Sequence, residues 1–485
     1  MNSRSRTSVL SRAGVRFRAT ATAPFHAPSC KRIHHMMHHW RFQGGFPVRV
    51  VARLAPAFLL CLTASLTTAQ PTASAEMPVF SQTGPQPALP VSSQTLDLAT
   101  CIHLALERQP RIAAQQATLT ASEDGREAVE KLRFPATLDP EIPVRRRQAC
   151  LGVTAAAAGL EQDQRDAAYA VARTYFTVIY AREQERIARG VVDRIGATRD
   201  AAQRALDAGA ADITSADVNR ATVYQRLAET RRIQATSGVK RALAALKEAI
   251  GLEPECWLDV PPGRLPEPDV RPNRDEVVAA AVARRGEMIQ AGVFAQVVCL
   301  EIDAQGTSVL QRMQTFAAGT DIHARPVPQG VRNSEYRPGA VAPEMPGLLA
   351  GNRQERVEHA RALYARAGAM VATTRNLIVL EADDSFLRWE QASQQASAAR
   401  EAADSGDKLA ADQNRDFIAG LKVKVDEVVN AHVVAATARS QYNEFLYQQV
   451  LALADLERVT AGGFCAGLVE PTGPRTVITA GAKAK

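Results

Sequence analysis

The chain has 485 residues, enough for more than one domain, and 46% of them are hydrophobic but only 5% aromatic. Because aromatic rings bury the most apolar area per side chain, this alanine-rich composition favours long, thinly packed helices over one large globular core. The formal net charge of +7 does not indicate a nucleic-acid-binding protein. Ten of the 58 Lys and Arg residues and no acidic residue lie in residues 1–75, which leaves 48 basic against 51 acidic residues afterwards.

Residues 1–75 have the order of a secretory signal. Basic residues precede the apolar run Leu54–Leu66, and the small residues Ala73-Ser-Ala75 follow it as a cleavage site. We therefore expect export, with Met36 and Met37 as alternative starts of translation; a short apolar segment in a mis-assigned leader is the other interpretation. No later run reaches the roughly 18 apolar residues of a membrane-spanning helix.

A first helical-hairpin repeat is predicted over 95–251. The Pro- and Ser-rich residues 76–94 form a flexible spacer, and a helix begins near Thr95, which we expect to cap it. Pro110 interrupts this helix, which resumes to about Lys131. Residues 132–148 hold three prolines and a basic run and are expected to be a connector.

The longest predicted feature is a proline-free helix from about Cys150 to Leu206. The sequence breaks at 208–212, and Thr214 or Ser215 can cap a returning helix that reaches Ile250. Gly251 is the expected stop signal, so the two helices form a hairpin.

The second half repeats the first. After a Pro-rich linker at 252–272, a second helical-hairpin repeat is predicted over 273–463, followed by a tail at 464–485. The segment 281–289 matches 105–113 at an offset of 176, and later apolar positions match at an offset of 210. The difference is an insert at 306–351, whose prolines allow only short β or extended segments.

The second hairpin has its own boundaries. Its outgoing helix is expected from Asn352 to about Asp416, its reversal at 418–421 and its returning helix over 425–459. A chance match between two alanine-rich helical segments is the alternative to duplication.

No catalytic, metal or cofactor site is predicted. Five cysteines remain after the leader, an odd number at wide spacing that indicates neither a disulfide framework nor a zinc site. The histidines after residue 75 are far apart, and no phosphate loop or nucleophile motif occurs. We expect that the protein is not an enzyme. The cysteines and histidines after residue 75 are Cys101, Cys150, Cys256, Cys299, Cys465, His103, His323, His359 and His432.

Several stretches resemble the TolC-type outer-membrane efflux proteins. Residues 96–111 are similar to the opening helix of that family, which ends in Ala-Leu, two polar residues and Asn-Pro. The reversals at 208–221 and 419–426 are similar to its Gly-Leu-small turn and the Asp-Val-x-x-Ala that follows. Residues 442–463 are similar to its closing helix. The motifs occur in this order over 95–463.

The resemblance implies a mainly α, TolC-like fold of tandem-duplicated long helical hairpins. It implies a homotrimeric, passive outer-membrane channel, in contact with outer-membrane lipid, whose helical part lies in the periplasm. A periplasmic adaptor and an inner-membrane pump would be its partners, with no role for nucleic acid. The residues at the hairpin tips expected to contact the adaptor are Gly209, Ala210, Asp217, Gly420, Leu421 and Asp426.

Alternatives remain at three places. Neither 132–150 nor 306–351 shows the alternation of a membrane strand, so short, atypical β or extended segments are expected in place of regular barrel strands. A periplasmic helical-hairpin interaction protein without a complete pore is therefore the second interpretation. The tip aspartates either favour a helix dipole or form a ring that binds cations. The run Arg145–Arg147 either faces anionic lipid or is solvated.

Overall fold

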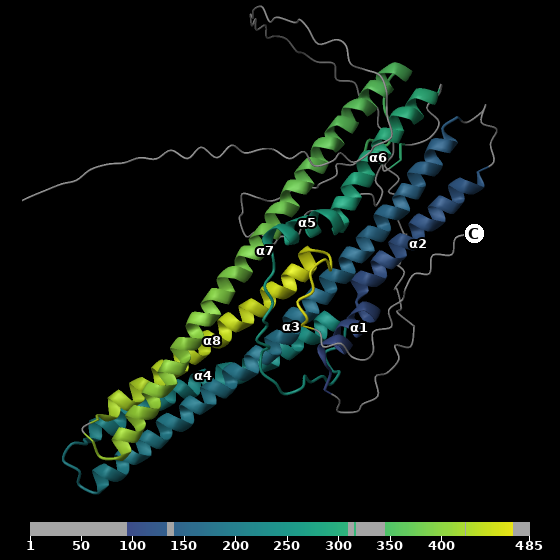
Figure 1. Cartoon of the computed structure of the whole chain (residues 1–485). Helices are drawn as coiled ribbons and strands as arrows, with labels where there is room; N and C mark the ends of the chain where they lie inside the picture. Colours follow the sequence, from purple (N-terminus) through teal and green to yellow (C-terminus); the bar gives the residue numbers. More distant parts are fainter. Residues whose placement is uncertain (1–94, 133–139, 309–314, 317–344, 422, 469–485) are drawn as a thin grey trace, which may run out of the picture. The chain divides into compact units, whose positions relative to one another are not determined.

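The computed structural model describes residues 95–132, 140–308, 315–316, 345–421 and 423–468, all of which belong to one compact unit, 86–485. Within these ranges the chain is mainly helical (Figure 1). The helices are α1 (Leu98–Arg108), α2 (Pro110–Lys131), α3 (Ile142–Asp207), α4 (Ser215–Ile250), α5 (Arg274–Arg284), α6 (Gly286–Thr307), α7 (Arg353–Ile418) and α8 (Val425–Val459).

The helix lengths confirm the tandem duplication. Helices α1 and α5 each have 11 residues, α2 and α6 each have 22, and α3 and α7 each have 66. The returning helices α4 and α8 have 36 and 35 residues. Adding the predicted offset of 176 to the bounds of α1 and α2 gives the bounds of α5 and α6. Each repeat is thus two short helices followed by a long hairpin.

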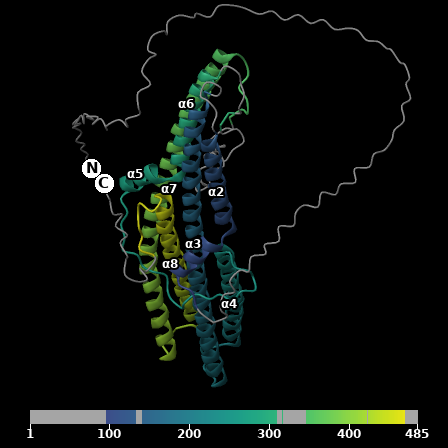
Figure 2. The ribbon, with the colours of Figure 1, turned by 90° about the vertical axis from the view of Figure 1, so that its right-hand side faces the viewer.

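Two antiparallel hairpins, α3 with α4 and α7 with α8, lie side by side (Figures 1 and 2). Helix α8 also packs on α3, which joins the two hairpins. Helices α2 and α6 run along α3 and α7 beyond the ends of the returning helices, and α6 contacts both α3 and α7. The packing places the two reversals at the same end of the unit (Figure 1).

The core is a seam between helices, as the composition predicts. Its largest cluster lies where α1, α3, α4 and α8 meet and includes Val171, Phe176, Leu246 and Val450. Between α7 and α8, toward the tips, the seam includes a cluster of small residues, Ala410, Ala431 and Ala435. A side chain at Gly406 of α7 would place its Cβ 3.1 Å from the Cα of Ala435 on α8. Small residues allow this close approach of two helix backbones.

The start of α1 differs from the prediction. Asp97, not Thr95, caps the helix, and its carboxylate accepts from the Thr100 N–H at 2.9 Å. Thr95 instead forms an isolated parallel bridge with Asp259 of the linker. An ionised carboxylate two residues further along provides the stronger acceptor for the free N–H groups of the first turn.

The predicted connector at 132–148 is wrong in its second half. Helix α3 begins at Ile142, eight residues before the expected start, with a proline in its first turn. A proline there removes no intrahelical hydrogen bond, so Pro143 is compatible with the helix start. Arg145 is consequently a helical residue that faces the interior.

Several predicted segments lie outside the described residues: the leader 1–75, the spacer 76–94, and most of the insert 306–351 and of the tail 464–485. The linker 252–272 is described and packs Leu258, Val260 and Leu265 into the core. In the described part of the chain, no helix has an apolar stretch long enough to cross a lipid bilayer.

Candidate functional site

The two hairpin tips share one backbone geometry. At the end of α3, Gly209 adopts φ of +78°, and its N–H and that of Ala210 donate to carbonyls of the last helical turn at 3.0 Å. At the end of α7, Gly420 adopts φ of +70° with the same bonds from its own N–H and that of Leu421. This left-handed C-cap places a glycine at the sharpest point of each reversal.

The tip aspartates have different roles. Both the N–H and the hydroxyl of Thr214 donate to the Asp217 carboxylate, at 3.0 and 2.7 Å. These hydrogen bonds hold the pKa of Asp217 below its usual value. At the start of α8 the corresponding contact is from the Lys424 N–H to Glu427, at 3.2 Å. Asp426 instead faces Arg220 of α4 at 3.5 Å.

The repeat register could have revealed the difference between the two aspartates. The offset of 210 relates Asp217 to Glu427, not to Asp426. The structure thus gives Asp217 a helix-capping role and Asp426 a contact between the hairpins.

The ends of the two hairpins pack against each other. Ile195 of α3, Val218 of α4 and Val429 of α8 belong to a single buried cluster close to the tips. The Arg220–Asp426 ion pair, with both side chains about half exposed, spans the outside of the same junction. The surface around the tips is therefore built from both repeats.

The two tips present different surfaces to solvent. Ile418 is 72% exposed and Leu421 58% exposed on either side of Gly420. The first reversal, 208–212, carries only alanine, glycine and aspartate. The aliphatic side chains of Ile418 and Leu421 bury little area within the fold. The second tip is therefore the more apolar of the two.

A buried ionic cluster joins α3, α6 and α7 and includes Arg145, for which both interpretations of the run 145–147 are wrong; Arg146 and Arg147 are exposed. The guanidinium of Arg145, 3% exposed, donates to Glu141 at 2.9 Å and to Glu301 of α6 at 3.0 Å. Gln148 of α3 also donates to Glu301, and Gln305 bonds Arg356 of α7. The side chain of Arg145 is therefore a structural ion-pair partner.

A second buried cluster lies where α5 ends. Arg285, fully buried, donates to Glu287 at 2.7 and 3.1 Å and also bonds Glu381 of α7. Arg458 of α8 bonds the other oxygen of Glu381 at 2.8 Å. Neither cluster was predicted, because charges on an amphipathic helix are ordinarily placed on its solvated face.

In the described residues the cysteines and histidines do not gather into one site. None of the five cysteines in the described residues forms a disulfide, and burial raises the pKa of Cys101 to about 12. Burial, and then the nearby Arg194, lowers the pKa of His432. In the parts of the chain that the structure covers, no three His, Cys, Asp or Glu side chains are grouped closely enough to hold a metal ion.

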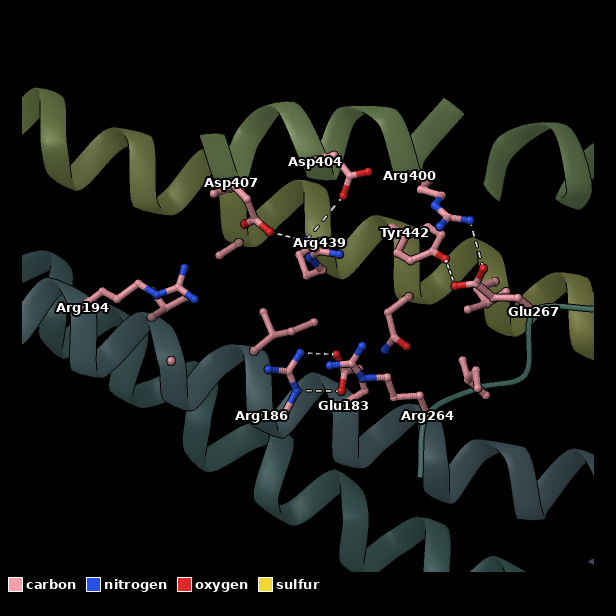
Figure 3. A pocket seen from close by; sticks show the side chains of 18 residues that line it. Glu183, Arg186, Arg194, Arg264, Glu267, Arg400, Asp404, Asp407, Arg439 and Tyr442 are labelled. Carbon is pink, nitrogen blue, oxygen red and sulfur yellow. Dashed lines mark hydrogen bonds and ion pairs between the residues drawn. The ribbon is translucent and has the colours of Figure 1, made fainter. Parts of the chain in front are cut away.

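The seam between the hairpins encloses one further feature, a cavity of about 440 Å³ between α3, α7, α8 and the linker (Figure 3). Its rim carries several arginines paired with carboxylates, and its apolar wall includes Ile187 and Val191 of α3. No pattern in the sequence predicted it, because its lining comes from four separated segments.

The fold is that of solved outer-membrane channels. The structure matches the outer-membrane channel OprN with a TM-score of 0.60 and 16% identity over 76% of this chain and 90% of that chain. It matches the Campylobacter jejuni CmeC outer membrane channel with a TM-score of 0.59 and 11% identity, over 78% and 91%. It also matches the open state of the Neisseria gonorrhoeae MtrE outer membrane channel, with a TM-score of 0.58, 15% identity and coverage of 76% and 89%.

The sequence comparisons gave no match: no family model matches the chain, and no curated protein matches it significantly. The structural matches confirm, at the level of the fold, the resemblance to the TolC-type efflux proteins that the sequence motifs indicate.

Proposed function

We propose that this chain is the outer-membrane component of an export system, a passive trimeric channel that a periplasmic adaptor and an inner-membrane pump engage at the hairpin tips. The observation that carries the proposal is the pair of equal-length hairpins whose tips share one C-cap geometry and one buried cluster. The fold match over about nine tenths of the OprN, CmeC and MtrE chains supports it.

In this proposal the helical part lies in the periplasm and the chain is exported by its leader. The protein catalyses no reaction. The long helices supply a stiff wall, since hairpins joined by small residues pack closely along their length. The adaptor binds the second tip, at Gly420 and Leu421, more strongly than the first, at Gly209 and Ala210, because only the second exposes large aliphatic side chains.

Membrane fractionation with chemical crosslinking tests the assembly. The proposal expects the protein in the outer-membrane fraction and a crosslinked species of three chains. A monomer in the soluble periplasmic fraction would contradict it.

A tip variant tests the partner site. We expect Leu421→Asp to reduce copurification of the adaptor at least several-fold, because a charge cannot replace an aliphatic contact. Leu409→Asp is the matched control, since Leu409 is also exposed but lies about two and a half turns before the end of α7, away from the tip. Equal loss in both variants would argue against a contact at the tip.

One observation favours a second function, that of a periplasmic interaction protein without a complete pore. Only ten residues, 132–141, separate α2 from α3, whereas 45 residues, 308–352, separate α6 from α7. A membrane-spanning pair of strands needs roughly ten residues in each strand, in addition to the turn. Conductance across a planar lipid bilayer separates the two functions: the channel gives discrete openings and the pore-less protein gives none.

A further inference from the structure

The cavity between the two hairpins is lined mainly by polar and charged side chains, with a smaller apolar wall. Ile187 and Val191 of α3, Leu265 of the linker and Leu446 of α8 supply its apolar surface. Charged side chains from α3, α7, α8 and the linker surround the opening (Figure 3). A volume of about 440 Å³ falls within the range of roughly 300–1,000 Å³ typical of sites for small molecules.

The space exists because small residues line it. Gly190 of α3 and Ala435 and Ala436 of α8 all belong to its lining. A Cβ built on Gly190 would meet only the end of the Arg194 side chain, at 3.9 Å, and its φ is not positive. The backbone therefore does not require glycine at this position, and a larger residue would fit by filling the cavity.

The rim has an excess of positive charge. Five arginines and four carboxylates line the cavity. Glu183 pairs with Arg186, Glu267 with Arg400, and both Asp404 and Asp407 with Arg439. Within the described residues, the remaining two arginines, Arg194 and Arg264, have no ion-pair partner. Figure 3 shows Arg264 beside the Glu183–Arg186 pair and Arg194 at the far end.

We propose that the cavity binds a small organic anion with an apolar body, such as an aromatic carboxylate or sulfonate. The apolar body lies against Ile187, Val191 and Leu265, and the anionic group accepts charge-assisted hydrogen bonds from Arg194 or Arg264. The proposal concerns this cavity alone and is independent of whether the chain forms a channel.

Calorimetric titration of the full-length protein tests the proposal with naphthalene-2-sulfonate as the probe. Its uncharged amide, naphthalene-2-sulfonamide, has nearly the same shape and serves as the matched ligand. Each titration is corrected with a blank into the same detergent buffer. We expect the sulfonate to bind at least tenfold more tightly than the amide, because only the anion pairs with a guanidinium.

Three variants locate the site. Gly190→Leu should abolish sulfonate binding, and Arg194→Gln together with Arg264→Gln should weaken it about tenfold while leaving the amide unaffected. Arg189→Gln is the control, since Arg189 is exposed on the same helix, pairs with Glu185 at 3.1 Å and does not line the cavity. Circular dichroism confirms that each variant is folded.

Equal affinities for sulfonate and amide would overturn the proposal. So would an unchanged sulfonate affinity in the double arginine variant, which adds no bulk to the cavity and remains informative if Gly190→Leu does not fold. Loss of binding in Arg189→Gln to the same extent would mean that the anion responds only to the general charge of the surface, and would also overturn it.

Discussion

Removal of the Arg285 guanidinium would test whether buried charges hold the second repeat together. In Arg285→Met, Glu287 loses both of its hydrogen bonds from this guanidinium, whereas Glu381 keeps its 2.8 Å bond from Arg458. Loss of one partner from a buried ion pair costs about 3–5 kcal/mol, because the remaining charge has neither water nor a counter-ion. At about 2.1 cal/mol/K of unfolding entropy for each described residue, the melting temperature should fall by roughly 4–7 °C.

Thermal melting followed by circular dichroism measures the effect, with Gln109→Met as the matched control. Gln109 is the residue at the same position of the first repeat and donates to two carbonyls at the end of α4, at 2.8 and 2.6 Å. Loss of these neutral bonds costs about 1–3 kcal/mol. Replacing Glu287 by Gln in the Arg285→Met background should restore part of the loss, since a buried amide is less costly than a buried carboxylate. The reasoning is refuted if Arg285→Met melts no lower than Gln109→Met.

Three further predictions concern single positions. Asp217→Ala should destabilise the protein by about 0.5–2 kcal/mol in urea unfolding. Because the pKa of Asp217 is lowered in the folded state, its stabilisation of the fold is present above the unfolded pKa near 3.8 and is lost as pH falls through the folded pKa. Gly368→Ala, on an open helix face, should stabilise by about 0.5–1 kcal/mol, whereas Gly406→Ala should not, since its Cβ meets Ala435. The pKa of His432 is lowered in the folded state, so below the unfolded pKa near 6.5 the unfolded chain binds the proton more readily and the fold loses stability. His432→Leu should therefore reduce the drop in melting temperature between pH 7 and pH 5.

The helices and their ends could be predicted from sequence because each depends on local chemistry. The glycines at 209, 251 and 420 all adopt positive φ at the ends of long helices, and Thr214 precedes α4 as predicted. A glycine after an apolar helical pattern indicates such an end by itself, since few other residues adopt this backbone conformation.

The buried charges could not be predicted, because their burial depends on helices far apart in the sequence. Arg145 and Glu301 are separated by 156 residues, and Arg285 and Glu381 by 96. The early start of α3 was missed for a related reason. The prolines at 140 and 143 suggest a break in the helix. In the structure, Pro143 lies in the first turn of α3, which the Arg145–Glu141 ion pair helps to stabilise.

The equal length of α3 and α7 indicates which part of the duplicated fold is constrained. At 1.5 Å and 100° per residue, 66 residues of α3 and α7 each extend about 100 Å. One extra residue in either helix would shift its tip along the axis and turn it away from the shared cluster of Ile195, Val218 and Val429. The connectors before these helices differ by 35 residues, ten against 45, without disturbing that match. The repeats have therefore diverged in the connectors and kept the distance to the tips, which is the expected outcome if both tips must reach one partner at the same level.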